Sequence, residues 1–320
     1  MIAAPSKREG RPWRANAMNR GLAPAPRLAA ARLSSPHRAH RRGLKSNNSI
    51  MESSPFRPVR RVRPVAPYIG GKRNLAKRIC ALIEETPHRT YAEAFVGMGG
   101  IFLRRRRRPE AEVINDWSRE VSNFYRILQV HYVAFLDMLR FQITTRAEFE
   151  RLLAVDPETL TDLQRAARFL ALQRMAFGGK VDGRAFGVSL HQPGRFDVTK
   201  LQPMLEDLHD RLAGVVIERL PFEQFIDRYD SKDTLFYLDP PYWNCETDYG
   251  AGLFERESFW RLQAVLKGLS GRFIMSINDV PQVRELFKDF HQEAVETTYG
   301  IMATGQQKAA ELIITGGAAW

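Results

Sequence analysis

One segment constrains the fold more than any other: an apolar run that ends in an acid, two prolines and an aromatic residue. The run Thr234–Leu238 leads directly into Asp239-Pro240-Pro241-Tyr242. Aromatic and β-branched residues favour a buried strand, and the prolines end it because they fix φ and lack an N–H group. Open α/β sheets bind their ligands at the carboxyl ends of their strands. The segment therefore predicts a functional site at the end of a parallel strand.

The residues of this segment suit recognition of an exocyclic amine. Asp239 offers a carboxylate, and the carbonyl of Pro240 is held rigidly and is free to accept a hydrogen bond. Two acceptors side by side form a clamp for the two hydrogens of an NH2 group. The ring of Tyr242 offers a flat face for a base, and such stacking contributes about 1–3 kcal/mol per base in single-strand sites. We therefore assign Asp239, Pro240 and Tyr242 as the catalytic residues.

A glycine-rich turn forms the second candidate site. The apolar run 89–95 breaks at Gly97, Gly99 and Gly100, and Asp116 follows Gly97 by 19 residues at the end of the next predicted strand. Glycines let the backbone approach a ligand closely, and an acid at this spacing is placed to bind ribose hydroxyls. The turn predicts a nucleoside-binding site beside the first strand.

A third turn spans residues 67–73 and contains Gly70 and Gly71 followed by Lys72. It precedes a predicted helix whose apolar residues are Leu75, Ile79 and Leu82. The glycines bring the backbone near a ligand, and Lys72 is placed to meet a carboxylate near the start of the helix. Taken alone, the turn is equally compatible with an exposed lysine.

The rest of the chain alternates short apolar runs with amphipathic stretches, which predicts a mainly parallel sheet covered by helices on both faces. Further predicted strands span residues 112–116, 215–220, 272–277 and 311–315, and predicted helices span residues 101–107, 255–269 and 280–290. The interval between Asp116 and Asp239 exceeds what one helix and one strand need. We expect a smaller inserted subdomain at 131–213, helical at first and loop-like around 177–195.

The net charge of +12 belongs mostly to the N-terminus. Residues 1–50 hold 11 Lys and Arg with a single acid, Glu9, so the remaining residues carry only about +2. We expect residues 1–50 to be a disordered basic extension. A phosphate-binding arm, a targeting peptide and sequence upstream of a true start at Met51 all remain open. The two cysteines, Cys80 and Cys245, lack zinc spacing and predict neither a disulfide framework nor a metal site.

The three turns, in this order, resemble those of the D12-class, Dam-like N6-adenine DNA methyltransferases of the α group, phage-type relatives included. The resemblance covers most of residues 64–315. Its specific segments are Tyr68-Ile69-Gly70-Gly71-Lys72, Phe95-Val96-Gly97-Met98-Gly99-Gly100, Asn115-Asp116 and Asp239-Pro240-Pro241-Tyr242. It implies a Rossmann-like methyltransferase fold whose last strand is antiparallel, with S-adenosylmethionine as cofactor. The cofactor-binding residues that we assign are Tyr68, Lys72, Phe95, Gly97, Gly99, Asp116 and Asp239.

The resemblance also divides the chain. Residues 51–130 and 214–320 would form the catalytic domain, and the mostly helical insert 131–213 would be the target-recognition domain. Its loop-rich part contains Lys180, Arg184 and Arg195, which we assign to DNA binding because phenylalanines lie between them. Those phenylalanines, Phe177, Phe186 and Phe196, are equally compatible with a local core. The arginine run 104–108, expected at a helix end, either complements the helix dipole or grips phosphate.

These features predict a site-specific DNA N6-adenine methyltransferase that acts on a flipped base of double-stranded DNA. N4-cytosine, RNA adenine and protein-glutamine methyltransferases are the alternative enzymes, and a non-catalytic DNA-binding module on the same fold is the alternative outside enzymes. We expect a cytoplasmic monomer without membrane association, because no stretch approaches the roughly 20 apolar residues of a membrane-spanning helix. A cognate restriction endonuclease is a further partner that this function allows.

Overall fold

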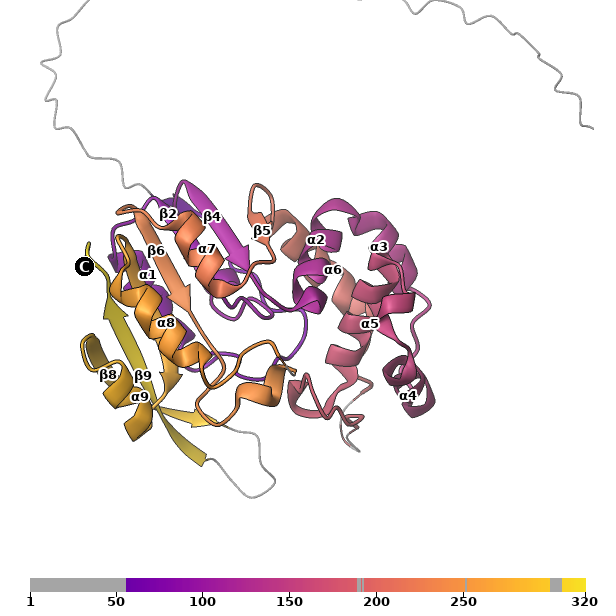
Figure 1. Ribbon diagram of the computed structural model, residues 1–320. Helices are drawn as coiled ribbons and strands as arrows, with labels where there is room; N and C mark the ends of the chain where they lie inside the picture. The colour runs from indigo at the N-terminus through magenta and orange to yellow at the C-terminus, as the bar shows by residue number, and fades with distance from the viewer. Residues whose placement is uncertain (1–55, 189–190, 192, 251, 300–306) are drawn as a thin grey trace, which may run out of the picture. The chain divides into compact units, whose positions relative to one another are not determined.

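The computed structural model describes residues 56–188, 191, 193–250, 252–299 and 307–320. The expected disorder of residues 1–50 and the start at Met51 lie outside these ranges. The described residues build a seven-stranded sheet in the order β5-β4-β2-β6-β7-β9-β8, shown in Figure 1. The strands are β2 (Thr90–Glu93), β4 (Ala111–Asn115), β5 (Val216–Glu218), β6 (Thr234–Leu238), β7 (Arg272–Asn278), β8 (His291–Tyr299) and β9 (Gln307–Gly316).

The sheet is mainly parallel, as the sequence predicts. β2 pairs in parallel with β4 and β6, β4 with β5, and β6 with β7. β9 lies between β7 and β8 and is antiparallel to both, which confirms the antiparallel last strand. The chain adds strands outward from β2 through β4 to β5, and then returns to add β6 and β7 on the other side. The order therefore reverses between β2 and β6, where sheets of this kind hold ligands.

Helices cover both faces because side chains alternate along each strand. In β6, Leu235 and Tyr237 pack with α1 (Ala76–Glu85) on one face, whereas Phe236 and Leu238 pack on the other. The helices of that second face are α7 (Phe222–Tyr229), α8 (Ser258–Lys267) and α9 (Pro281–Leu286). Every residue of β6 is buried, so this strand lies in the centre of the core. The described residues contain no helix both long and apolar enough to cross a membrane.

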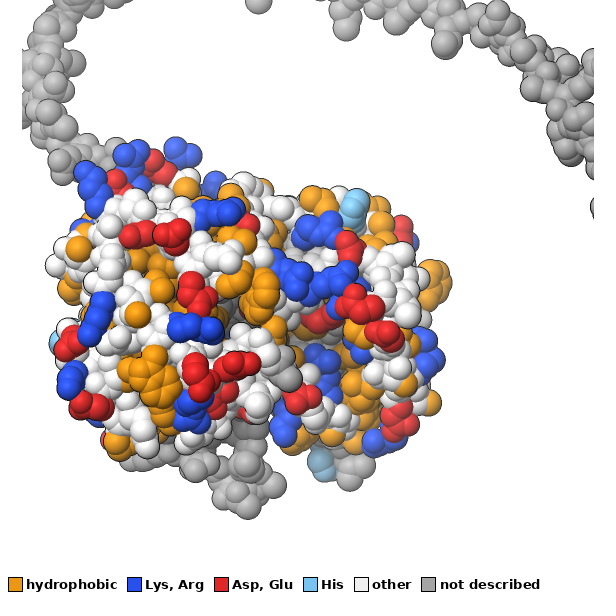
Figure 2. Space-filling model, in the orientation of Figure 1, with side chains coloured by type: hydrophobic (Ala, Val, Ile, Leu, Met, Phe, Trp, Pro, Cys, Tyr) orange, Lys and Arg blue, Asp and Glu red, His pale blue; other side chains and the backbone are white. Residues whose placement is uncertain are grey.

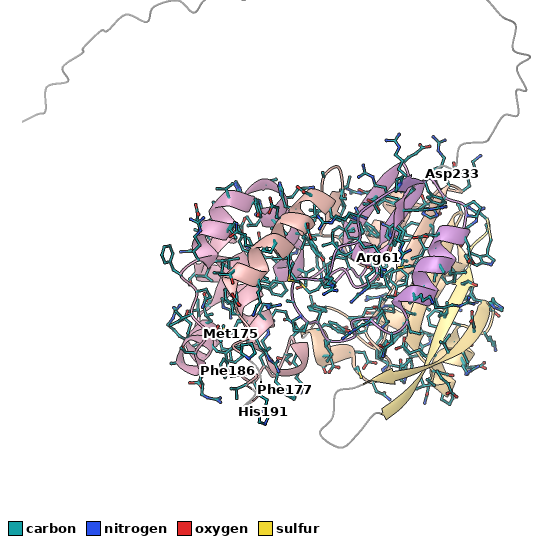
Figure 3. The ribbon with its side chains drawn as sticks, turned by 180° about the vertical axis from the view of Figure 1, so that it is seen from behind. Arg61, Met175, Phe177, Phe186, His191 and Asp233 are labelled. Atoms are coloured by element: carbon teal, nitrogen blue, oxygen red, sulfur yellow. The ribbon has the colours of Figure 1, made fainter. Side chains whose placement is uncertain are left out.

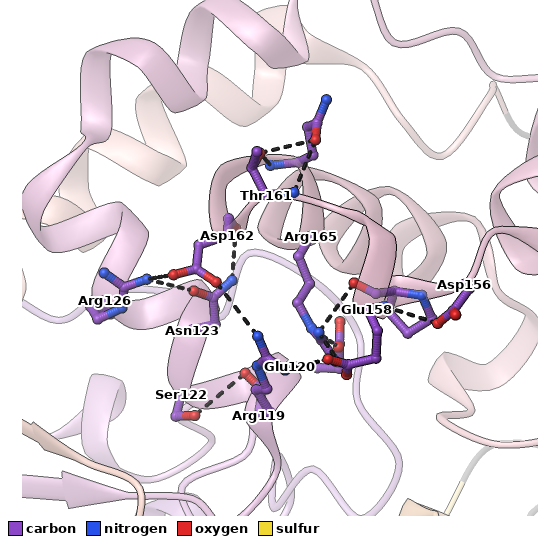
Figure 4. Close-up of polar contacts among 12 residues, drawn as sticks. Arg119, Glu120, Ser122, Asn123, Arg126, Asp156, Glu158, Thr161, Asp162 and Arg165 are labelled. Carbon is purple, nitrogen blue, oxygen red and sulfur yellow. Dashed lines mark hydrogen bonds and ion pairs between the residues drawn. The ribbon is translucent and has the colours of Figure 1, made fainter.

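The part of the chain between β4 and β5 forms a group of helices that packs beside the sheet (Figure 1). Its members are α2 (Arg119–Val130), α3 (Tyr132–Leu139), α4 (Arg146–Ala154), α5 (Asp162–Met175) and α6 (Val198–Arg211). Figure 4 shows the polar contacts that join α2 to the start of α5. Arg165 donates to Glu120 at 2.5 Å and to Glu158 at 3.0 Å. The domain boundary at residue 131 stays a prediction.

The helix predicted at 101–107 is wrong. The chain forms one 3-10 turn, η1 (Phe102–Arg104), and then a short strand, β3 (Arg107–Arg108), that pairs with β1 (Arg57–Pro58). The helix stops because Arg105 adopts an extended conformation with ψ of 148° and is fully buried. The arginine run therefore begins at the end of a single 3-10 turn rather than of a longer helix, and the burial of Arg105 explains why the predicted helix stops there.

Arg105 belongs to a buried cluster with Glu112 and Arg211, which we call the structural ionic cluster. Arg211 binds Glu112 through two hydrogen bonds of 2.7 Å, and Arg105 donates a third, very short one. The Arg105 guanidinium also stacks 3.6 Å from the ring centroid of Tyr91. Burial alone would raise the pKa of Glu112, but the two arginines bring it below its usual value.

The helix predicted at 280–290 is too long. α9 ends at Leu286, Phe287 packs into the core and Phe290 packs against it, and strand β8 begins at His291. Strand β8 was not predicted, because it is rich in polar residues and lies at the edge of the sheet, where it pairs with β9. The other predicted strands and helices are confirmed, with ends that shift by a few residues.

Candidate active site

A cleft of about 1390 Å³ opens at the carboxyl ends of β2, β4 and β6. Six of the predicted site residues line it: Tyr68, Lys72, Phe95, Gly97, Asp116 and Asp239. Gly99, Pro240 and Tyr242 are neighbours of lining residues. The turns that the sequence singled out separately thus meet at the point where the strand order reverses. Figure 2 shows that this face of the molecule is hollowed between the sheet half and the helical group.

Asp116 follows β4 and is held by the glycine-rich turn. Its carboxylate accepts an N–H from Gly97 at 2.9 Å and another from Ser118 at 2.9 Å. Burial raises the pKa of Asp116 to about 6, and the two N–H donors oppose this shift. Gly97 has a φ of +49°, and a Cβ there would lie 2.9 Å from the Tyr68 ring. Only glycine therefore allows Tyr68 and Asp116 to approach the same space.

Asp239 ends β6 with its side chain 20% exposed to the cleft. Lys72 Nζ lies 2.8 Å from Asp239 Oδ1, and the Ser276 hydroxyl donates to the same oxygen at 3.2 Å. Ser276 is itself fixed by a 2.7 Å hydrogen bond to Tyr237. No described residue donates to Oδ2, so this oxygen is free for a ligand. Burial raises the pKa of Asp239, and Lys72 opposes the shift.

Lys72 is only 2% exposed and connects three of the groups around it. Besides Asp239, it donates to the Tyr242 hydroxyl at 2.7 Å and to the Gly70 carbonyl at 3.3 Å. Its Nζ also lies 4.3 Å from the centroid of the Tyr242 ring. The expected meeting of Lys72 with a carboxylate is therefore found, with Asp239 as the carboxylate.

Glu311 is the second acid near Lys72, and the sequence analysis missed it. Its Oε2 lies 4.0 Å from Lys72 Nζ, and the residue is fully buried in β9. Burial raises the pKa of Glu311, whereas Lys72 and the Tyr242 hydroxyl oppose this. An acid within the otherwise apolar run 309–314 was the available signal. We call Lys72, Asp239 and Glu311 the cleft ionic cluster.

A family model described as D12 class N6 adenine-specific DNA methyltransferase matches residues 68–301. The chain belongs to this family. The match begins at the Tyr68 turn and extends past Asp239, so it contains every segment that carries the resemblance in the sequence.

The chain is also similar to known methyltransferases. The type II methyltransferase M.CviBI of Paramecium bursaria Chlorella virus NC1A is 25% identical over 74% of this chain and 91% of its own. The type II methyltransferase M1.LlaDCHI of Lactococcus lactis subsp. cremoris is 27% identical over 79% of this chain and 95% of its own. The DNA N-6-adenine-methyltransferase of Escherichia phage P1 is 25% identical over 72% of this chain and 32% of its own.

The D12-class cleft has the features that a nucleoside with a sulfonium side chain needs. Asp116 faces it with a carboxylate that can accept ribose hydroxyls. An apolar wall is formed by Phe95, whose ring lies 5.7 Å from Phe222 and 5.9 Å from Phe254. Tyr249, a further residue missed in the sequence, donates to the Ile69 carbonyl at 3.2 Å and lines the cleft. The residues present therefore fit S-adenosylmethionine.

Glu93, at the end of β2, is a buried acid in the same cleft. It accepts a 2.5 Å hydrogen bond from the Tyr91 hydroxyl. Burial raises the pKa of Glu93 to about 8, with Tyr91 and Arg105 opposing the shift. Glu93 is therefore largely protonated at neutral pH. It can donate a hydrogen bond there, unlike an ordinary surface glutamate.

The three residues assigned to DNA binding lie outside the lining of the cleft. Lys180 is exposed, whereas Arg184 is half-buried and donates to the Lys180 carbonyl at 3.2 Å and to Gln173 at 3.3 Å. Arg195 donates to the Ala176 carbonyl at 3.0 Å. Of these residues, Lys180 alone has its cation turned outward without a hydrogen bond in the described part of the chain. Their DNA-binding role stays a prediction.

The phenylalanines of this loop divide between core and surface. Phe196 is buried, and Phe186 packs 5.5 Å from the Phe149 ring. Phe177 is 54% exposed. Figure 3 shows Phe177, Phe186 and His191 together at one end of the helical group. Two of the three aromatic rings therefore belong to the local core, and one is available at the surface.

Proposed function

We propose that the protein transfers a methyl group from S-adenosylmethionine to the N6 amine of adenine in double-stranded DNA. The observation that carries this proposal is the state of Asp239: Lys72 and Ser276 hold one carboxylate oxygen, and the other is free in a cleft that Asp116 also lines. S-adenosylmethionine, held by residues such as Asp116 and Phe95, would supply an electrophilic methyl group in this cleft.

The clamp acts on the amine of the target base. Asp239 Oδ2 and the Pro240 carbonyl accept the two N6 hydrogens, which frees the nitrogen lone pair from the ring. Methyl transfer would form the N–C bond as the C–S bond of the donor breaks, and Asp239 would accept the proton that N6 then releases. The raised pKa of Asp239 suits this final step. Rate arises from alignment and from fixed charges, without a covalent enzyme intermediate.

Adenine N6 is inaccessible in a duplex, so the base is rotated out of the helix at a cost of a few kcal/mol. We propose that the Tyr242 ring receives it. Lys72 Nζ lies 4.3 Å from the centroid of the Tyr242 ring and holds its hydroxyl, which fixes the ring. A fixed aromatic ring loses less conformational entropy when a base stacks on it.

We propose the helical group as the target-recognition domain, with Lys180, Arg184 and Arg195 on its DNA-facing loop. Basic and acidic side chains are mixed over the face seen in Figure 2, so affinity depends on local contacts rather than overall charge. Lys180→Ala should lower the salt dependence of DNA binding by about one phosphate contact. Arg184→Ala should instead loosen the loop, because its guanidinium bonds to Gln173 and to a main-chain carbonyl.

The partners and setting follow from this activity. Double-stranded DNA is the proposed substrate, and a cognate restriction endonuclease is a proposed partner because two relatives are named type II methyltransferases. We propose that the protein acts as a monomer in the cytoplasm. Co-expression with neighbouring nuclease genes, followed by a protection assay on DNA, tests the restriction partner.

The activity is tested by methyl transfer from labelled S-adenosylmethionine to matched DNA, RNA and protein substrates, followed by identification of the methylated base. N6-methyladenine in DNA is expected. N4-methylcytosine, methylated RNA or methylated protein would replace the proposal with that alternative. Asp239→Ala should lower the rate by at least about a thousandfold. The matched control is Asp233→Ala, an exposed acid at the opposite end of β6, which should leave the rate unchanged.

A further inference from the structure

Three arginines gather at one side of the cleft: Arg61, Arg73 and Arg104. Arg61 Nε donates to the Arg104 carbonyl at 3.0 Å, which brings the first and third together. Burial lowers the pKa of Arg104, and the nearby positive charges of Arg73 and Arg61 lower it further. The three side chains therefore repel one another. A half-buried Arg104 beside two other cations is a costly arrangement without an anion.

No carboxylate of the described residues lies within ion-pair distance of these three arginines. Other exposed arginines nearby are paired: Arg60 with Asp207 at 2.5 Å and Arg78 with Glu293 at 2.9 Å. A guanidinium carries five N–H donors, and the described hydrogen bonds of Arg104 use one acceptor, the Gly100 carbonyl. Three cations of the cleft lining thus have no carboxylate partner among the described residues.

Lys72 lies between the Gly100 turn, which Arg104 also approaches, and Asp239. A Cβ built on Gly100 would lie 3.5 Å from the Lys72 main-chain nitrogen and 3.7 Å from Arg104 Nη1. Lys72 Nζ, at the other end of the same residue, lies 2.8 Å from Asp239. Arg104 therefore lies toward the main-chain end of Lys72, and the clamp lies at its ammonium end. In S-adenosylmethionine the carboxylate likewise lies at the far end of a three-carbon chain from the sulfur.

We propose that Arg61, Arg73 and Arg104 bind the α-carboxylate of the methyl donor's amino-acid part. The proposal rests on the proposed function, because it places the sulfur of the donor at Asp239. Arg104, the most buried of the three, makes the main contact, and exposed Arg61 and Arg73 close the site from the solvent side. In Figure 3, Arg61 lies between the half of the molecule that contains α1 and the helical group, well away from Phe177 and His191. This separation favours the cofactor over a phosphodiester bound at the recognition loop.

The test compares two ligands that share the adenosine and sulfur but differ in the amino acid: S-adenosylhomocysteine and methylthioadenosine. Affinities are measured by calorimetry, with competition titration for the weaker ligand. Arg104→Gln should weaken the binding of S-adenosylhomocysteine by about ten- to hundredfold, which is the usual effect of losing a charged hydrogen bond. The double variant Arg61→Gln with Arg73→Gln should weaken it by about two- to tenfold. Methylthioadenosine should bind all variants and the unchanged protein equally.

The matched control is Arg107→Gln, an exposed arginine of β3 that lies outside the lining of the cleft. It should change neither affinity. Equal losses for both ligands, or no loss for either, would overturn the proposal. An unchanged nucleoside affinity together with weaker, less salt-dependent DNA binding would assign the arginines to a phosphodiester instead. If the unchanged protein binds no S-adenosylhomocysteine, the proposed function itself fails.

Discussion

Two buried ionic clusters use the same kinds of groups but differ in how fully their charges are satisfied. In the structural cluster, two guanidinium groups share the single carboxylate of Glu112, and the pKa of Glu112 is lowered. In the cleft cluster, the single ammonium of Lys72 faces two carboxylates, Asp239 and Glu311, and burial raises the pKa of both. The carboxylate of the first cluster is fully paired, whereas the second cluster holds more carboxylates than cations.

From this difference we expect the structural ionic cluster to stabilise the fold and the cleft ionic cluster to serve the reaction. A buried carboxylate with ideal partners stabilises the fold as an ion, because removing it leaves its partners uncompensated. A buried carboxylate with too few partners is held in place by the surrounding structure and binds a hydrogen donor or cation more strongly than an exposed one would. The sulfonium and the amine of the proposed reaction are such ligands. Each prediction below tests one side of this comparison.

The largest expected effect is on Glu112. Glu112→Gln leaves Arg105 and Arg211 buried without a counter-ion, and the free energy of unfolding should fall by about 3–5 kcal/mol. Urea unfolding at pH 7 measures it. Because the pKa of Glu112 is lowered by folding, its contribution is present above the unfolded pKa and is lost as pH falls through the folded value.

The control for that variant is Glu110→Gln. Glu110 pairs with Arg89 at 2.7 Å, but both side chains are exposed, by 49% and 62%. Screened pairs of this kind contribute little, so the change should stay within about 1 kcal/mol. Equal effects at positions 110 and 112 would show that burial does not distinguish the two pairs.

Glu93 should behave in the opposite way. Its pKa is raised to about 8 by burial, so the native state favours the protonated form. Its stabilising contribution is complete below the unfolded pKa and is lost as pH rises through about 8. Glu93→Gln keeps the hydrogen bond from Tyr91 and removes the ionisation. At pH 8 it should raise the free energy of unfolding by about 2–4 kcal/mol relative to the unchanged protein.

The measurement for Glu93 is urea unfolding of both proteins at several pH values between 5 and 8. The two curves should agree near pH 5 and separate as pH rises. A constant difference across this range would mean that Glu93 is ionised throughout. Its pKa would then be low, like that of Glu112, rather than raised like those of Asp239 and Glu311.

Much of the sheet and part of the site could be predicted from the sequence. Each predicted strand has a short apolar run, and Asp116 and Asp239 stand where those runs end, so local pattern and strand topology place them together. The buried, extended conformation of Arg105 and the strand β8 could not be predicted. The helical pattern ends at Arg105 because Glu112, on the next strand of the sheet, binds its guanidinium in the core. β8 is defined by its partner strand rather than by its own residues.

The cleft cluster shows the same limit. The sequence indicated that Lys72 would meet a carboxylate, but not which one, because 167 residues separate Lys72 from Asp239. Glu311 carries no motif at all. Its importance comes from the antiparallel pairing of β9 with β7, which brings Glu311 opposite Asn278 near the cleft. Such a contact depends on the register of strands distant in sequence, which composition and periodicity do not specify.

Glu311 should act as a positioning residue. Glu311→Gln leaves Lys72 with Asp239 as its single nearby carboxylate, which strengthens that ion pair and makes Asp239 less available to the amine. The kcat should fall by about tenfold with KM for DNA little changed, since the substrate does not touch Glu311. The acid limb of the kcat–pH profile should also move to lower pH, because a negative charge near Asp239 is removed.

The control for Glu311 is Glu293→Gln, an acid of the adjacent strand β8 that pairs with Arg78 at the surface. It should alter neither kcat nor the pH profile. A Glu311→Gln variant with lowered stability but an unchanged profile would show that Glu311 only fills the core.

The smallest expected effect concerns the stability of the clamp itself. Asp239→Asn should change the free energy of unfolding by less than about 1 kcal/mol, although it abolishes methyl transfer. Burial raises the pKa of Asp239, so its charge is costly in the native state, and Lys72 retains Glu311 and the Tyr242 hydroxyl when that charge is lost. Urea unfolding beside Glu112→Gln measures the contrast directly. A loss as large as that of Glu112→Gln would mean that the Lys72–Asp239 pair also stabilises the fold. The two clusters would then differ in location but not in their contribution to the free energy of unfolding.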